Sequence, residues 1–444
     1  MRLWEPLSHV EADRGGAVLA FGALIPRGIG AGDLYTFAMF RARSAPENRL
    51  EHRLSSISSE LVARVSAVAT GFVEPIADLT AAVAAVPAPT NDEAERAEFV
   101  AEVLRRFEYD DVEIDAISNV TGRIKGTTDG PALLLAGHTD TVFPRETPLP
   151  VTRTGDVLHG PGIGDNSLSV AAVAMVKQGL AQLGFEPPVD IFVTGNVGEE
   201  GLGDLRGMRA VMDALPQVGA AIAVEGHSLG RITNRAVGSR RLRVTLTGPG
   251  GHSWGDAGRV SAIHEMAKLV AKLDAVPLQS DPKTSLNVGL FEGGISVNTI
   301  APEASVVIDM RSTSGTALAT LVSRVEGIIA GARTSDISVA VEIVGDRPAG
   351  ALPSDAGLVP IGVEVLAALG MEAICDASST DANIPISRGI PSMCIGLTTG
   401  GNVHRVDEYI RIKPIATGFT QLLLDTILAT EALAAGKLPR QTPL

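Results

Sequence analysis

The sequence predicts an α/β protein, a mostly parallel sheet covered by helices on both faces, with a smaller β-α-β-β-α-β domain inserted into it. From about residue 60 onward, apolar strands alternate with amphipathic helices, the order that gives parallel sheets. The pattern becomes a split βαβ unit near Gly238 and returns to the first kind after Pro348. With 444 residues, the chain is also too long for one ordinary core.

The first part of the large domain begins with helices. Residues 60–86 carry apolar side chains at helical spacing, with a kink expected at Pro75. Residues 90–104 have a capped start with acidic side chains at the positive end of the helix dipole. The elements expected next are strands at 112–117, 133–138, 189–195 and 220–225, and a helix at 167–183.

The inserted domain is expected to span residues 238–345. Its predicted elements are strands at 241–247, 284–291, 304–310 and 337–344, and helices at 261–273 and 317–332. The elements expected after it are a helix at 358–369, strands near 374 and at 392–396, and a helix at 415–434. The large domain therefore comprises residues 56–237 and 346–444, and residues 1–55 form an unassigned N-terminal arm.

Composition narrows the class of protein. Hydrophobic residues make up 45% and charged residues 20%, as in soluble globular proteins, and the net charge of −14 argues against nucleic acid and anionic membranes as partners. The apolar run at 16–25 is too short to cross a membrane, and the acidic residues before it suit a signal peptide poorly. Only Cys375 and Cys394 could form a disulfide, so a cytoplasmic location is expected.

A histidine and a carboxylate end the apolar strand that begins at Leu133. His138 and Asp140 are two positions apart, so on an extended chain they point the same way. The pair is either a hydrogen-bonded structural couple, or one nitrogen of His138 binds a metal while Asp140 holds the other. Taken alone, the pair favours the structural interpretation.

Four further segments place polar groups at or beyond the ends of predicted strands. These groups are Asp165 in a glycine-rich loop, the adjacent Glu199 and Glu200, Glu225, and His404. Asp165 alone would suit a helix N-cap, but neighbouring glutamates at a buried strand end destabilise the fold unless a cation or shared proton compensates. Ligand crevices in open α/β sheets form at the carboxyl ends of strands. Two histidines with several carboxylates there suit a pair of divalent metals.

With these motifs the chain resembles the M20 family of metallopeptidases, which includes tripeptidases and aminoacylases. The matching motifs, in order, are Gly-His138-Thr-Asp140, Gly-Ile-Gly-Asp165, Gly-Glu199-Glu200-Gly, Val-Glu225-Gly, Gly-Gly-His252-Ser and Asn-Val-His404. The resemblance covers about residues 60–435. It implies a zinc-peptidase-like catalytic domain, and it identifies the inserted unit as a ferredoxin-like lid that commonly forms a homodimer.

The resemblance also implies a role for each motif. The implied cofactors are two divalent metal ions, zinc first, with manganese or cobalt as alternatives. Asp165 would bridge the two ions, with His138 and Glu225 on one and Glu200 and His404 on the other. Asp140 would orient the ring of His138.

The remaining implied roles concern catalysis and substrate. Glu199 would be the general base, and His252 would stabilise the oxyanion, often across the dimer. Asn298 and Arg311 match positions of the inserted domain that bind substrate, where a guanidinium would grip a carboxylate. His227 and Asp381 lie near the motifs in sequence and receive no role in the chemistry.

The predicted function is two-metal-dependent hydrolysis of an amide bond in a small peptide or N-acyl amino acid with a free carboxylate. A metal-bound hydroxide that Glu199 activates would attack the carbonyl. One alternative keeps the site but releases ammonia from an aromatic amine, a ureido group or an amidine. Another is a binding protein without turnover, which the complete set of ligands disfavours. The substrate itself stays open.

Overall fold

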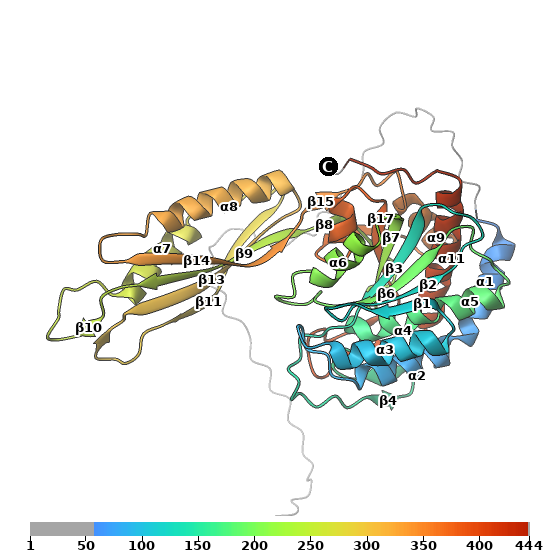
Figure 1. Cartoon of the computed structure of the whole chain (residues 1–444), viewed down its shortest axis with the longest axis horizontal. Coiled ribbons are helices and arrows are strands. Elements are labelled where there is room, and N and C mark those ends of the chain that lie inside the picture. The colour runs from blue at the N-terminus through green and yellow to red at the C-terminus, as the bar shows by residue number, and fades with distance from the viewer. Residues whose placement is uncertain (1–56, 443–444) are drawn as a thin grey trace, which may run out of the picture. The chain divides into compact units, whose positions relative to one another are not determined.

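The computed structural model describes residues 57–442, so the predicted N-terminal arm at 1–55 lies outside the described residues. The strands of its largest sheet are β1 (Asp110–Ile114), β2 (Val120–Ile124), β3 (Ala132–His138), β6 (Ile191–Asn196), β7 (Val218–Glu225), β8 (Arg231–Ala236), β15 (Gly350–Ala351), β16 (Ile374–Ser378) and β17 (Ser392–Gly396). They run in the order β1-β2-β6-β3-β7-β17-β8-β15, with β16 beside β8 (Figure 1).

This sheet is mixed rather than mostly parallel, which corrects the prediction. The four middle strands β6, β3, β7 and β17 are parallel neighbours. By contrast β1 pairs antiparallel with β2, β2 with β6, and β8 with β17 and β15. Of these antiparallel pairs only β1 and β2 are joined by a short connection, which leaves no room for the crossover that parallel pairing needs.

Helices cover both faces of the large sheet. One face carries α1 (Ser59–Gly71), α2 (Val73–Ala84), α3 (Ala94–Arg106), α4 (Leu168–Ala174), α5 (Val176–Gln182), α9 (Val359–Ala368) and α11 (Ile415–Ala434). The other carries α6 (Arg206–Ala214) and α10 (Asn383–Ser387). Leu133 and Leu135 of β3 pack toward the first set and Leu134 toward the second, because successive side chains of a strand point to opposite faces. The apolar interior therefore continues up to His138.

The first two helices meet at a bend that was expected at Pro75. The break lies instead at Phe72, where α1 ends and α2 begins at an angle of 49°. Pro75 sits in the first turn of α2, where a missing N–H leaves no bond unmade. Within residues 57–442 no single helix is long and apolar enough to cross a membrane. The bent pair α1 and α2 reaches that length and apolar content only when the two helices are counted together.

The inserted domain forms its own sheet and core. Its elements are β9 (Gly238–Thr247), α7 (Ala262–Asp274), β11 (Thr284–Gly293), β13 (Glu303–Ser312), α8 (Gly315–Ala330) and β14 (Ser338–Arg347), one for each predicted element. The antiparallel order is β11-β13-β9-β14, and both helices pack on one face of the sheet (Figure 1). A short ribbon of β10 (Gly251–His252) and β12 (Thr299–Ile300) also belongs to this domain.

Two small features complete the fold near the ends of the parallel strands. A π-type turn, η1 (Ile163–Ser167), leads into α4. A four-stranded sheet joins β4 (Thr152–Thr154), β5 (Val157–His159), β18 (Gly400–Gly401) and β19 (Tyr409–Arg411). This sheet brings the chain after β17 beside the chain before η1, so two segments distant in sequence meet at one edge of the central strands.

Candidate metal centre

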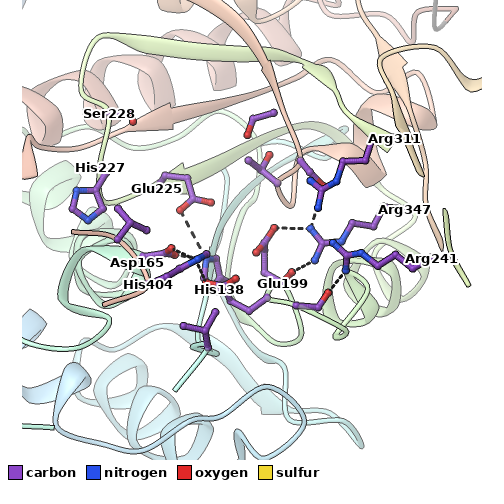
Figure 2. A pocket seen from close by; sticks show the side chains of 17 residues that line it. His138, Asp165, Glu199, Glu225, His227, Ser228, Arg241, Arg311, Arg347 and His404 are labelled. Carbon is purple, nitrogen blue, oxygen red and sulfur yellow. Dashed lines mark hydrogen bonds and ion pairs between the residues drawn. The ribbon is translucent and has the colours of Figure 1, made fainter. Parts of the chain in front are cut away.

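The predicted ligands meet at the carboxyl ends of the parallel strands. His138 ends β3 and Glu225 ends β7, whereas Asp165 comes from η1. All of the predicted ligands and the predicted base line one cavity of about 550 Å³, namely His138, Asp165, Glu199, Glu200, Glu225 and His404. In Figure 2 the side chains of His138, Asp165, Glu225 and His404 lie on one side of Glu199. Three arginines, Arg241, Arg311 and Arg347, lie on the other.

Asp165 lies between the two histidines. Its Oδ1 is 3.2 Å from Nε2 of His138, and its Oδ2 is 3.0 Å from Nε2 of His404. A further carboxylate accompanies each histidine: Glu225 Oε2 lies 3.8 Å from Nε2 of His138, and Glu200 Oε1 lies 2.9 Å from Nε2 of His404. The cluster therefore consists of two sets of nitrogen and oxygen donors that share one carboxylate.

Asp140 has a broader role than the sequence suggested. Its two carboxylate oxygens accept the backbone N–H groups of Glu199 and Glu200, each at 2.9 Å, and Oδ2 also accepts the Thr90 hydroxyl at 2.9 Å. Nδ1 of His138 lies 3.1 Å from the carbonyl oxygen of Asp140 and 3.6 Å from its Oδ1. Asp140 therefore holds the turn that carries both glutamates, and its backbone contributes most to orienting His138.

The electrostatics of the cluster suit a bound cation. Desolvation raises the pKa of Glu225 to about 8, against the opposing charge of His138. Hydrogen bonds with Asp165 and Glu200 raise the pKa of His404 to about 10. Desolvation would also raise the pKa of Asp165, but hydrogen bonds with the two histidines hold it well below its usual value.

Neighbouring carboxylates in such a cavity destabilise the fold unless cations compensate. Ligand atoms of His138, Asp165 and Glu200 all lie within 4.8 Å of one another. Imidazole and carboxylate donors at this spacing are the ligands that zinc and similar divalent ions accept. The residues present therefore fit a divalent metal centre.

Glu199 is held by a residue that the sequence reasoning missed. Nη1 of Arg347 lies 3.2 Å from Oε1 of Glu199 and 3.1 Å from the Ser379 hydroxyl, and Nη2 donates to the Glu199 carbonyl. Burial raises the pKa of Glu199 well above its usual value, and the charge of Arg347 opposes this rise. The sequence did offer one indication of Arg347: it lies at the junction between the two predicted domains, where ligand sites often form.

Two further arginines from the inserted domain line the cavity. Nε of Arg241 donates to Oδ1 of Asp309 at 2.9 Å, and Nε of Arg311 donates to Oδ2 of the same carboxylate at 2.6 Å. Arg241 also donates to the carbonyl of Gly201. Asp309 therefore fixes both guanidinium groups at the cavity, including the predicted substrate-binding Arg311.

His252 and Asn298 do not join this cluster within the described part of the chain. Both are exposed, and neither is among the residues that line the cavity. They lie near each other in the β10–β12 ribbon, where the N–H of Ser253 donates to the Asn298 carbonyl at 3.0 Å. The role of His252 was expected across a dimer, so a single chain does not test it, and the roles of both residues stay predictions.

Two residues that received no chemical role lie at the cavity or beside it. His227 lines the cavity (Figure 2), and its Nε2 lies 2.8 Å from Oε1 of Glu408. Asp381 is buried next to β6, where its Oδ2 accepts the Asn196 amide at 2.7 Å, and desolvation raises its pKa to about 6. Spacing along the chain could not reveal these contacts, because each joins segments far apart in sequence.

Comparison with known proteins agrees with this geometry. The family described as peptidase family M20/M25/M40 matches residues 134–427. A putative succinyl-diaminopimelate desuccinylase of Mycobacterium tuberculosis is 28% identical over 351 residues, covering 76% of this chain and 94% of that protein. The succinyl-diaminopimelate desuccinylase of Corynebacterium glutamicum is 27% identical over 352 residues, covering 76% and 92%.

Solved structures share the fold. A tripeptidase from Staphylococcus aureus superposes with a TM-score of 0.68 at 21% identity, covering 85% of this chain and all of that one. A Bacillus subtilis protein described as a dinuclear metal-binding peptidase of the M20 family has a TM-score of 0.59 at 16% identity, covering 81% and 99%. The chain is therefore a metallohydrolase that belongs to the M20/M25/M40 peptidase family.

Proposed function

We propose that this protein is a two-metal hydrolase that cleaves an amide bond in a small peptide or an N-acyl amino acid with a free carboxylate. The observation that carries the proposal is the position of Asp165. Each of its two oxygens faces a different histidine, and each histidine has a second carboxylate beside it. Two donor sets joined by one carboxylate are what a pair of ions with a shared ligand requires.

In this proposal Asp165 is the shared ligand of the two ions. His138 and Glu225 complete one site, and Glu200 and His404 complete the other. When bound, the two ions polarise the scissile carbonyl and make the attacking water more acidic. Zinc is the preferred ion, and manganese or cobalt would suit the same nitrogen and oxygen donors.

Glu199 moves the proton in this reaction. It accepts a proton from the attacking water and later delivers it to the leaving amine, so that one carboxyl group serves as base and then as acid. Its bond to Arg347 holds one carboxylate oxygen and leaves the other for the water. A buried carboxylate is a stronger base than an exposed one, which suits this task.

The inserted domain would supply the remaining contacts as a lid and as a dimer interface. Arg311 would bind the substrate carboxylate, with Asp309 fixing its orientation. His252 and Asn298 would act in the cavity of a second copy of the chain. Strongly exposed apolar side chains near them support such an interface, namely Trp254 at 85%, Ile295 at 78% and Val297 at 103% relative exposure.

We also propose that the protein acts in the cytoplasm. Cys375 and Cys394 are both free thiols, which agrees with a reducing compartment.

The test uses metal-free protein reconstituted with zinc, manganese or cobalt. The substrates are dipeptides, tripeptides and N-acyl amino acids, including N-succinyl compounds because two relatives are named as desuccinylases. New primary amine and free ammonia are measured separately. We expect metal-dependent release of amine with two ions bound per chain. Ammonia release without a new peptide-derived amine would refute the amide-bond assignment, and a stoichiometry of one ion would refute the shared role of Asp165.

A further inference from the structure

Glu408 is a fully buried carboxylate in the loop that follows His404. Its Oε1 accepts the backbone N–H groups of Gly164 and Asp165, each at 2.9 Å, and lies 2.8 Å from Nε2 of His227. Its Oε2 accepts the N–H of Gly162 at 3.0 Å. Three of these four contacts converge on Oε1 and one reaches Oε2, so both oxygens of the carboxylate are engaged.

The partners of Glu408 come from the segments that carry three proposed ligands. The loop at 162–165 ends in Asp165, His227 lies two residues after Glu225, and Glu408 itself lies four residues after His404. One buried side chain therefore ties together three loops that are remote in sequence.

The other two proposed ligands are held by Asp140 instead. That carboxylate accepts the N–H of Glu200 and lies beside the ring of His138. The cluster thus has two organising carboxylates, and each serves a different subset of the ligands. Asp140 belongs to the motif that the family resemblance identifies, whereas Glu408 was not assigned any role by the sequence.

Two glycines allow the ring of His227 to pack against the loops at this contact. A Cβ on Gly164 would lie 2.2 Å from Nε2 of His227, and a Cβ on Gly400 would lie 2.7 Å from its Cε1. Real Cβ atoms do not approach other atoms that closely, so any side chain at either position would push the imidazole away from Glu408. The glycines and the carboxylate together fix the ring where it joins the three loops.

We propose that Glu408 is a positioning residue that sets the spacing of Asp165, Glu225 and His404. It acts through three backbone N–H groups and the imidazole of His227, without touching the ions or the substrate. The inference rests on the proposed metal centre. Groups that orient metal ligands in this way typically contribute about 10- to 100-fold to metal affinity.

The test replaces the carboxylate with its amide, Glu408→Gln. The amide keeps one accepting oxygen and presents an NH2 group to donors that previously met a carboxylate, so the 162–165 loop can no longer be held by both oxygens. Metal-free wild type and variant are titrated with zinc by calorimetry, and cobalt loading is followed by visible absorption. We expect zinc affinity to fall by about 10-fold or more, with an altered cobalt spectrum. Because the amide also leaves a buried donor without an acceptor, the melting temperature of the metal-free variant should fall as well, and the titrations are made at a temperature where both proteins are folded.

Asp407→Asn is the matched control. This neighbouring residue loses the same charge in the same loop, but its side chain is exposed and pairs with Arg405. Its other contact, with the Asn402 amide at 3.0 Å, can be kept by the asparagine oxygen. Its zinc affinity should equal that of wild type. Equal zinc affinity for Glu408→Gln and wild type would overturn the inference, whereas a wild type that binds no zinc would instead refute the proposed metal centre.

A second variant decides the matter if Glu408→Gln does not fold. His227→Ala removes one of the four contacts and leaves the backbone donors in place. Because only one contact is lost, we expect a smaller effect than the 10- to 100-fold stated above. A zinc affinity about threefold to tenfold below wild type would support the proposal. An affinity equal to that of wild type would overturn it.

Discussion

Replacing Asp140 with asparagine should weaken metal binding as well as catalysis. The carboxylate accepts the N–H groups of Glu199 and Glu200 with one oxygen each, both at 2.9 Å. An asparagine side chain keeps only one oxygen, so one of these buried N–H groups must face an NH2 group. A role limited to orienting His138 would have predicted a loss of rate with most of the metal retained.

The size of the effect follows from the stranded N–H group. A buried donor without an acceptor destabilises its surroundings by about 1–3 kcal/mol. The turn can move so that the donor finds another partner, but Glu200 then leaves its position 2.9 Å from His404. Metal binding must return Glu200 to that position, so the cost of the unsatisfied donor is subtracted from the free energy of metal binding. A loss of 1–3 kcal/mol corresponds to roughly a 5- to 150-fold lower affinity.

Calorimetric titration of the metal-free protein measures this affinity directly. Asp190→Asn is a suitable control, because Asp190 also accepts a backbone N–H group, from Gly126 at 2.7 Å, but lies before β6 at the end of the strand opposite the site. That variant should bind metal like wild type. Wild-type affinity and stoichiometry in Asp140→Asn would refute the reasoning that its carboxylate fixes Glu200.

Three further outcomes are expected. Glu199→Gln should lower kcat by about two to four orders of magnitude while metal stoichiometry stays unchanged, and near-normal kcat would remove Glu199 from the role of base. Arg311→Met should raise KM by about tenfold or more for a substrate with a free carboxylate, but not for the matching amide; an equal rise for both would exclude a carboxylate contact. Burial raises the pKa of Asp425 in α11 to about 8, above its value in the unfolded chain, so the wild-type free energy of unfolding should decrease as pH rises from about 4 to 8. Asp425→Asn has no carboxyl group to titrate, so its free energy of unfolding should exceed that of wild type by on the order of 5 kcal/mol at pH 8. Urea denaturation of both proteins at several pH values measures this difference, and a difference that does not change with pH would contradict the prediction.

Some elements were predictable because their patterns are local. Each of the six main elements of the inserted domain carries an amphipathic repeat, and each matches a predicted element within a few residues. The ligands that end β3 and β7 were also visible in the sequence, because a charged group directly after an apolar strand stands out without any knowledge of its partners.

Other features depend on contacts that sequence spacing does not encode. Strands β2 and β8 are short and partly polar, so their own pattern is weak, and each pairs with strands on both sides in the sheet. The break near Phe72 arises between two helices rather than at a proline. Nothing in the sequence around Arg347 or Glu408 distinguishes them from other charged residues. Their contacts with Glu199 and with the N–H of Asp165 exist only in the folded chain.

The contacts that complete the metal centre also have a consequence for how the chain folds. Asp165 and Glu408 are 243 residues apart, Glu200 and His404 are 204 apart, and Glu199 and Arg347 are 148 apart. Contacts of such high sequence separation form late, because the entropy of closing long loops must be overcome first. The inserted domain, whose core is its own, lies between the halves of the site. During synthesis it emerges before residues 347–408, so a ribosome-bound chain cannot bind metal through the full set of ligands until His404 has emerged.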